Sequence, residues 1–264
     1  MLCSTCRLRP PVTPDGRCIL CAGPAGPVPP AAAFAVPMAQ QAPRSPAGLA
    51  KAVVILLAAV VGADLLALAA GQNMRTFLGG VAERGSGQAV IDEADRADLF
   101  YGGAGLLQVL TMLAAAVVFI VWFHRVRMNA ELFDASAQPM GPGWSIGAWF
   151  VPFGNLVLPR RIAGGIWTAS APVNPDGSRR AVPATVMNVW WAAWICSLVL
   201  SRYTSSAYWK AEETQEIVDA AGLVMLTDAF DIVAAVLAIL FVRKLTRMQT
   251  ERAAFGRQPF PTHL

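Results

Sequence analysis

The sequence predicts an all-α membrane protein with four transmembrane helices, one interfacial or re-entrant segment and a small N-terminal knuckle built on four cysteines. Three observations predict this fold class. Hydrophobic residues make up 55% of the 264 residues and charged residues only 14%, a balance that does not describe a soluble protein. The apolar residues gather in four blocks, each long enough to cross a bilayer core of about 30 Å. Two C-x2-C pairs also stand together near the N-terminus.

The first element, residues 1–22, is a predicted metal knuckle. Cys3 and Cys6 form one pair, eleven residues follow, and Cys18 and Cys21 form the second pair. Two such pairs can place four thiolates tetrahedrally around one Zn²⁺ ion. Four sulfur ligands leave no open coordination position, so a structural zinc site is the favoured interpretation. An iron site or a redox role is the alternative.

Residues 23–49 form the second element, a predicted linker. It contains seven prolines among alanines and glycines. Such a composition cannot build a hydrophobic core, because it offers too little apolar surface to offset the entropy of ordering the chain. We therefore expect an extended tether, partly in the polyproline conformation.

The third element is a four-helix membrane domain over residues 50–250, followed by a cytosolic tail at 251–264. Its predicted spans are residues 52–71, 104–123, 184–204 and 222–242. With both termini in the cytoplasm, sixteen Lys and Arg residues fall on the inner side and five on the outer side. The positive-inside rule favours this orientation in a cell membrane. Because the basic residues indicate topology, we do not expect a nucleic-acid partner.

A fifth apolar stretch, residues 144–167, differs from the four spans. Pro152 and Pro159 interrupt helical hydrogen bonding, and Asn155 adds a polar group. Basic residues flank the stretch on both sides, so we expect it to return to the side it left, as an interfacial or re-entrant segment. Its tryptophans suit the headgroup layer of the membrane, where amphipathic rings are favoured: Trp144, Trp149 and Trp167.

Three acidic residues fall inside predicted spans: Asp64 in the first, and Asp228 and Asp231 in the fourth. Charged groups in hydrocarbon are costly and mark candidate functional sites. The i, i+3 spacing places Asp228 and Asp231 on one helical face. The rise per residue puts Asp231 at a depth similar to that of Asp64 and Asp228 somewhat shallower, which permits one shared polar cluster. Its candidate neighbours in the second and third spans are Gln108, Thr111, Ser197 and Ser201.

A purely structural interpretation of these acids is the alternative. Protonated carboxyls can hydrogen-bond between helices, and Arg202 can extend inward to pair with Asp228. The sequence does not decide between this arrangement and a site that binds a cation or relays protons.

Two runs of residues carry a family resemblance. The first reads Trp122-Phe-His-Arg125-Val-Arg127-Met-Asn129-Ala. The second contains Trp144, Trp149, Pro152, Asn155 and Pro159. Both runs resemble the bacterial multi-pass membrane family called domain of unknown function 4328, over roughly residues 50–250. The resemblance implies an integral membrane protein without an assigned activity. Arg160 and Arg161 depart from its pattern and make the interfacial segment more basic.

The favoured function is that of a non-enzymatic scaffold, sensor or recruiting protein, which acts at the cytoplasmic face of the membrane and contacts membrane lipid and a protein partner. The runner-up is a small transporter or an ion- or proton-conducting protein that uses the intramembrane acids. An intramembrane enzyme ranks third, because no metalloprotease, nucleophile-elbow or P-loop pattern occurs.

Overall fold

The computed structural model describes residues 2–12, 14–22, 42–85, 87–174, 176, 178–210 and 214–255, without the side chains of 81–83, 207–210, 214, 215 and 217. The chain divides into two units, residues 1–41 and residues 42–264. Most of the predicted linker (23–41) and the end of the predicted tail (256–264) lie outside the described residues.

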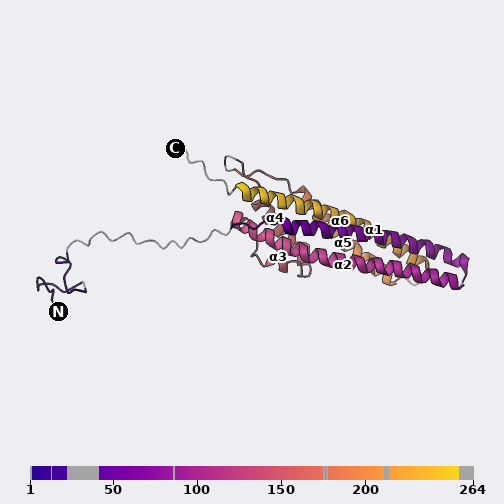
Figure 1. Ribbon diagram of the computed structural model, residues 1–264, viewed down its shortest axis with the longest axis horizontal. Helices are drawn as coiled ribbons and strands as arrows, with labels where there is room; N and C mark the ends of the chain where they lie inside the picture. Colours follow the sequence, from indigo (N-terminus) through magenta and orange to yellow (C-terminus); the bar gives the residue numbers. More distant parts are fainter. Residues whose placement is uncertain are drawn as a thin grey trace. The chain divides into compact units, whose positions relative to one another are not determined.

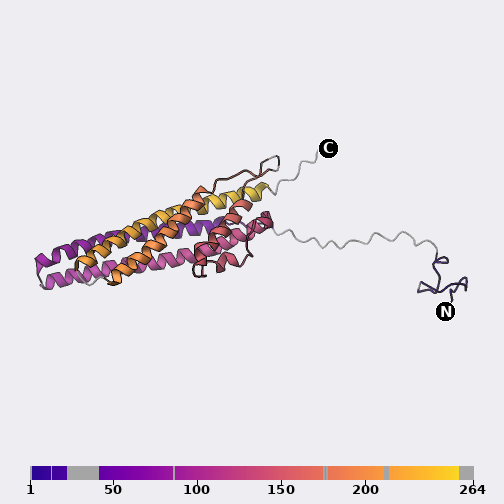
Figure 2. The same cartoon turned by 180° about the vertical axis from the view of Figure 1, so that it is seen from behind.

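Four long helices run side by side in the second unit (Figures 1 and 2): α1 (Ala47–Arg84), α2 (Gln88–Phe133), α5 (Thr185–Lys210) and α6 (Thr214–Phe255). Helix α1 packs along both α2 and α6, and α5 packs along α6. We call the end at which α1 turns into α2 the hairpin end, and the opposite end, which holds the connection from α2 to α5, the motif end. The N-terminus of α1 and the C-terminus of α6 also lie at the motif end.

Three stretches of these helices are long and apolar enough to cross a membrane: Ala47–Gly80, Gln88–Phe133 and Val218–Phe255. Helix α5 is not among them. Its 26 residues would extend about 39 Å, so its length suffices. Hydroxyl side chains, Asn188 and Arg202 lower its mean hydropathy. The crossing of the membrane by α5 therefore stays a prediction.

The helices continue well beyond the predicted spans at the hairpin end. Residues 72–84 and 88–103 belong to α1 and α2, although the sequence placed them in a loop between two spans. Arg84 stabilises this extension, since its Nη1 donates to both carboxylate oxygens of Glu93 at 2.9 Å. Gly85 ends α1 with a φ of 72°, a conformation that favours glycine. Helical hydrogen bonds satisfy the backbone equally well in water, so the edge of the apolar block does not end the helix.

The connection between α2 and α5 is broken into short pieces: η1 (Ala135–Ala137), α3 (Trp144–Gly147), η2 (Gly154–Leu156) and α4 (Leu158–Ala169). Pro159 lies in the first turn of α4, where its missing N–H costs nothing. Helix α4 approaches η1 so closely at Gly165 that a Cβ there would lie 2.6 Å from the carbonyl oxygen of Ala137. Two prolines thus prevent one continuous helix over residues 144–167, as the sequence predicted.

An ion pair joins the two ends of this connection. Asp134, which follows α2, lies 2.7 Å from Nη2 of Arg179. Hydrogen bonds from Ser136 and the guanidinium of Arg179 hold the pKa of Asp134 at about 2. The carboxylate therefore stays ionised through the neutral range.

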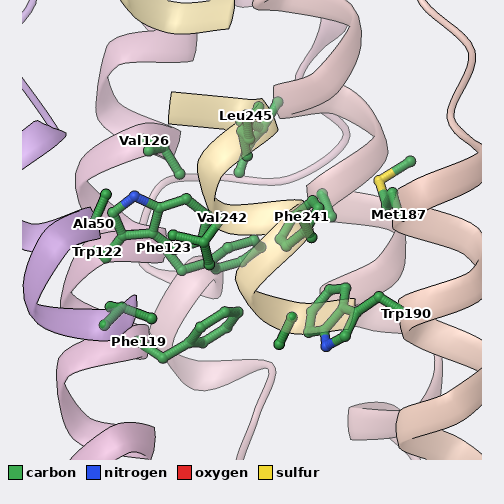
Figure 3. Packing of buried hydrophobic residues seen from close by; sticks show 14 of the residues in the cluster. Ala50, Phe119, Trp122, Phe123, Val126, Met187, Trp190, Phe241, Val242 and Leu245 are labelled. Carbon is green, nitrogen blue, oxygen red and sulfur yellow. The ribbon is translucent and has the colours of Figure 1, made fainter. Parts of the chain in front are cut away.

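The hydrophobic core lies toward the motif end and is rich in aromatic residues (Figure 3). Trp190 of α5 stacks on Phe241 of α6 with ring centroids 4.5 Å apart. Trp149 and Trp167 pack into this core, whereas only Trp144 keeps a largely exposed side chain (42%). The broken segment folds back against the helices and buries two of its tryptophans there. The depth of the three rings relative to the headgroup layer stays a prediction.

Candidate functional sites

The first unit brings the four predicted cysteine ligands together. The sulfur atoms of Cys3, Cys6, Cys18 and Cys21 all lie within 4.8 Å of one another, and all four are thiols without a disulfide. The backbone closes the site, since the N–H of Cys18 donates to Sγ of Cys3 at 3.2 Å. Gly16, with a φ of 76°, makes the turn before the second pair.

This geometry fits a tetrathiolate metal site. Sulfur ligands about 2.3 Å from a tetrahedral zinc ion lie roughly 3.8 Å apart. Sγ of Cys6 and Sγ of Cys18 are separated by 3.7 Å. The spacing therefore suits a metal of this size, without identifying it.

The four thiols have unlike electrostatic surroundings. Backbone N–H groups, that of Cys6 above all, lower the pKa of Cys3 to about 6, and the N–H of Cys21 lowers that of Cys18. Hydrogen bonds with the other thiols, that of Cys18 first, raise the pKa of Cys21 to about 12. A divalent cation in the centre would hold all four sulfurs as thiolates, because metal ligation displaces the thiol protons.

The second site is an acidic cavity between the long helices. Nε2 of Gln108 on α2 donates to Oδ1 of Asp64 on α1 at 2.9 Å and to Oδ1 of Asp228 on α6 at 3.0 Å. Both carboxylates are buried, with 3% and 6% of their surface exposed. The structure thus brings together the acids of the first and last predicted spans and the glutamine predicted to join them.

A cavity of about 570 Å³ adjoins these groups. Asp231, which is half-buried, lines it together with Asp64 and Asp228. Oδ2 of Asp64 is buried and has no hydrogen-bond partner. Thr204 of α5 and Thr227 of α6 also line the cavity and hydrogen-bond to each other at 2.9 Å.

The other predicted neighbours of the acids take different positions. Ser201 lines the cavity, but the hydroxyl of Thr111 donates to carbonyl groups of its own helix. Ser197 is buried, and its hydroxyl group lies beside the carboxyl group of Asp231 as predicted. Arg202 is exposed and does not form an ion pair with Asp228, so the pairing considered from the sequence is absent from the described residues.

Three residues of the first family run are buried near the motif end and form polar contacts there: Trp122, Arg127 and Asn129. Trp122 donates from Nε1 to Thr246 of α6 at 3.2 Å. Arg127, only 1% exposed, pairs with Glu131 and donates to the carbonyl oxygen of Met140 at 2.7 Å. Arg127 thereby fixes the path of the chain after α2, whereas Arg125 is half-buried and takes no such part.

Asn129 holds the start of the second unit in place. Its side chain accepts a hydrogen bond from the N–H of Arg44 at 3.0 Å and donates to the carbonyl oxygen of the same residue at 2.8 Å. It also donates to Oε1 of Gln249 on α6 at 3.0 Å. Gln249 in turn donates to the carbonyl oxygen of Val126 and to Ser170.

The sequence analysis did not single out Gln249, because one polar residue near the end of a helix gives little signal by itself. Its partners are 79 to 123 residues away in the sequence. Arg44 falls within the predicted linker, yet its backbone is ordered because Asn129 binds it.

The second family run divides into buried and exposed members. Trp149 and Pro159 pack inside, whereas Trp144 and Pro152 are exposed. Asn155 is half-buried and its side chain forms no hydrogen bond within the described residues. These residues do not form one site.

Comparison with known proteins gives one match. The family model described as Domain of unknown function (DUF4328) matches residues 86–247, from the start of α2 to near the end of α6. This match confirms the resemblance seen in the sequence. It includes Gln108 and Asp228 but not Asp64. No curated protein and no solved structure matches the chain.

Proposed function

Since the chain belongs to the family described as Domain of unknown function (DUF4328), which names no activity, we propose a function from the geometry of the chain itself. The protein is a non-enzymatic, four-span membrane protein that binds a proton or small cation in its acidic cavity and conducts it. Both termini lie in the cytoplasm. The geometry favours this runner-up function over the recruiting role that the sequence placed first.

One observation carries the proposal. A single amide group of Gln108 bridges two buried carboxyl groups, Asp64 and Asp228, and leaves Oδ2 of Asp64 unpaired beside a cavity. An amide has only two N–H donors, and both are used. A third carboxyl group, Asp231, lines the same space.

The charge balance of the cavity supports a bound cation or proton. No Lys, Arg or His is among the described residues that line it. An unpaired carboxylate in apolar surroundings is costly, so it takes up a proton or binds a cation. Groups that exchange a proton or a cation in this way are common in ion pathways through membranes.

Flux measurements test the proposal. Asp64→Asn with Asp228→Asn keeps the shape of the cluster and removes both charges. We expect this double variant to abolish the proton or Na⁺ flux of the purified protein in liposomes, driven by a K⁺ diffusion potential and read with a pH-sensitive dye or ²²Na⁺. The physical reason is that an amide neither releases a proton nor balances a cation.

Asp95→Asn is the matched control, because Asp95 is an exposed acid of α2 outside the cavity. This variant should keep the flux of the unchanged protein. Equal flux in the double variant, or a wild-type flux no greater than that of empty liposomes, would contradict the proposal. Gel filtration of each variant establishes that it is folded.

A second candidate function rests on the cysteine cluster. Four sulfurs within 4.8 Å of one another in a unit of their own suit a zinc knuckle that recruits a protein at the cytoplasmic face. The predicted orientation supports this location, since sixteen of the 21 basic residues fall on that side. Membrane lipid would be a further contact of this face.

A further inference from the structure

The long helices leave a gap between α2 and α5. Among the described residues the backbones of these two helices do not pack along each other, whereas each packs along a neighbour. At the motif end aromatic rings bridge them: Phe119 of α2 lies 5.7 Å from Trp190 of α5, and Trp149 lies between the two helices. Its ring lies 5.7 Å from Phe119 and Phe123 of α2 and 5.7 Å from Trp194 of α5. Toward the hairpin end the described residues include no aromatic ring contact between α2 and α5, and the acidic cavity lies there.

The two walls of this cavity differ in chemistry. Beside Gln108, α2 contributes a run of apolar side chains to the wall, including Val109 and Leu113, which are partly exposed. The wall from α5 carries hydroxyl groups, those of Ser201, Thr204 and Ser205. The carboxyl groups lie on the α1 and α6 side. One cavity therefore offers both an apolar surface and a strongly polar, acidic one.

One carboxylate oxygen of the cavity lacks a hydrogen-bond donor. Gln108 uses both of its N–H groups on the two Oδ1 atoms, and Oδ2 of Asp64 is buried without a donor. A bare metal ion or a proton would balance the charge but would leave most of the 570 Å³ and the apolar wall without a contact. An ammonium group supplies both a positive charge and N–H donors.

We infer that the cavity binds an amphipathic amine, that is, a protonated primary or secondary amine on an apolar body, which enters between α2 and α5. This inference rests on the cation site proposed above and names the class of its ligand. The ammonium group donates to Asp64 and Asp228, and the apolar body lies against Val109 and Leu113. The volume falls within the range of about 300 to 1,000 Å³ that is usual for small-molecule sites.

Binding of octylamine to the full-length protein in lipid nanodiscs tests the inference, with empty nanodiscs as the blank. We expect octylammonium to bind at least about tenfold more tightly than 1-octanol, which has the same chain without the charge. Octyltrimethylammonium, which has the charge but no N–H donors, should be weaker than octylammonium. Asp64→Asn with Asp228→Asn should reduce octylammonium binding about tenfold, while Asp95→Asn leaves it unchanged.

Ser201→Trp fills the α5 side of the gap without touching the carboxyl groups and should also reduce binding. Equal binding of octylammonium and 1-octanol, or octylammonium binding that the double variant leaves unchanged, overturns the inference. If the acids control ion flux but not octylammonium binding, the proposed conduction stands and the amine ligand is wrong. If the acids control binding but no flux occurs, the ligand class stands and conduction is wrong.

Discussion

Replacing Cys3 and Cys18 together by serine is expected to abolish stoichiometric zinc binding by the purified full-length protein. The change removes one ligand from each C-x2-C pair, and serine hydroxyls do not replace thiolates as zinc ligands. Structural zinc sites of this type contribute about 10 to 16 kcal/mol of apparent binding free energy at neutral pH, so losing two ligands should leave almost no bound metal. Elemental analysis should fall from about one zinc per chain to near zero.

Cys196→Ser is the matched control, because it removes the one cysteine outside the cluster, which is exposed on α5. Its zinc content should equal that of the unchanged protein. Wild-type protein without a stoichiometric metal would show the knuckle to be wrong. Iron in place of zinc, recognised by its thiolate charge-transfer absorption, would retain the site and overturn the metal assignment.

The same double variant also tests recruitment by the knuckle. We expect it to lose any protein that co-purifies with the wild type while it still inserts into the membrane, since the helical unit holds its own core. Co-purification of the same protein with both forms would contradict this role.

The local features of this chain could be predicted from its sequence. The cysteine cluster depends on two short spacings and one turn, all within about twenty residues, so its geometry is fixed locally. The gathering of Asp64, Gln108 and Asp228 could be anticipated from their similar depths in the predicted spans, because a helix has a constant rise per residue, although the sequence placed Asp231 nearer to the depth of Asp64 than Asp228. Polar groups at one depth of a helical bundle have few partners other than one another.

Features that depend on packing could not be predicted in the same way. The sequence predicted that the first two helices end at the edges of their apolar blocks. In the structure both helices continue further at the hairpin end, where Arg84 of α1 pairs with Glu93 of α2. The position of Trp149 between α2 and α5 depends on the path of a broken segment, which sequence periodicity does not define.

A large loss of stability is expected for Asn129→Ala. The change leaves Oε1 of the buried Gln249 without its partner, and it removes both hydrogen bonds to the exposed backbone of Arg44. An unpaired buried polar group costs about 1 to 3 kcal/mol and each lost hydrogen bond about 1 kcal/mol, so a total on the order of 3 kcal/mol is expected. The free energy of unfolding in detergent, followed by circular dichroism, measures this loss.

Limited trypsin digestion reports the same contact locally. In the unchanged protein the backbone of Arg44 is held on both sides by Asn129, so cleavage after Arg44 should be slow. In Asn129→Ala it should become fast, before the helices unfold, because a protease needs a mobile backbone. Asn155→Ala is the matched control, since Asn155 belongs to the same family pattern but its side chain forms no hydrogen bond among the described residues. Similar stability and similar cleavage of the two variants would mean that Asn129 does not hold the start of α1, and that its place in the family pattern has another cause.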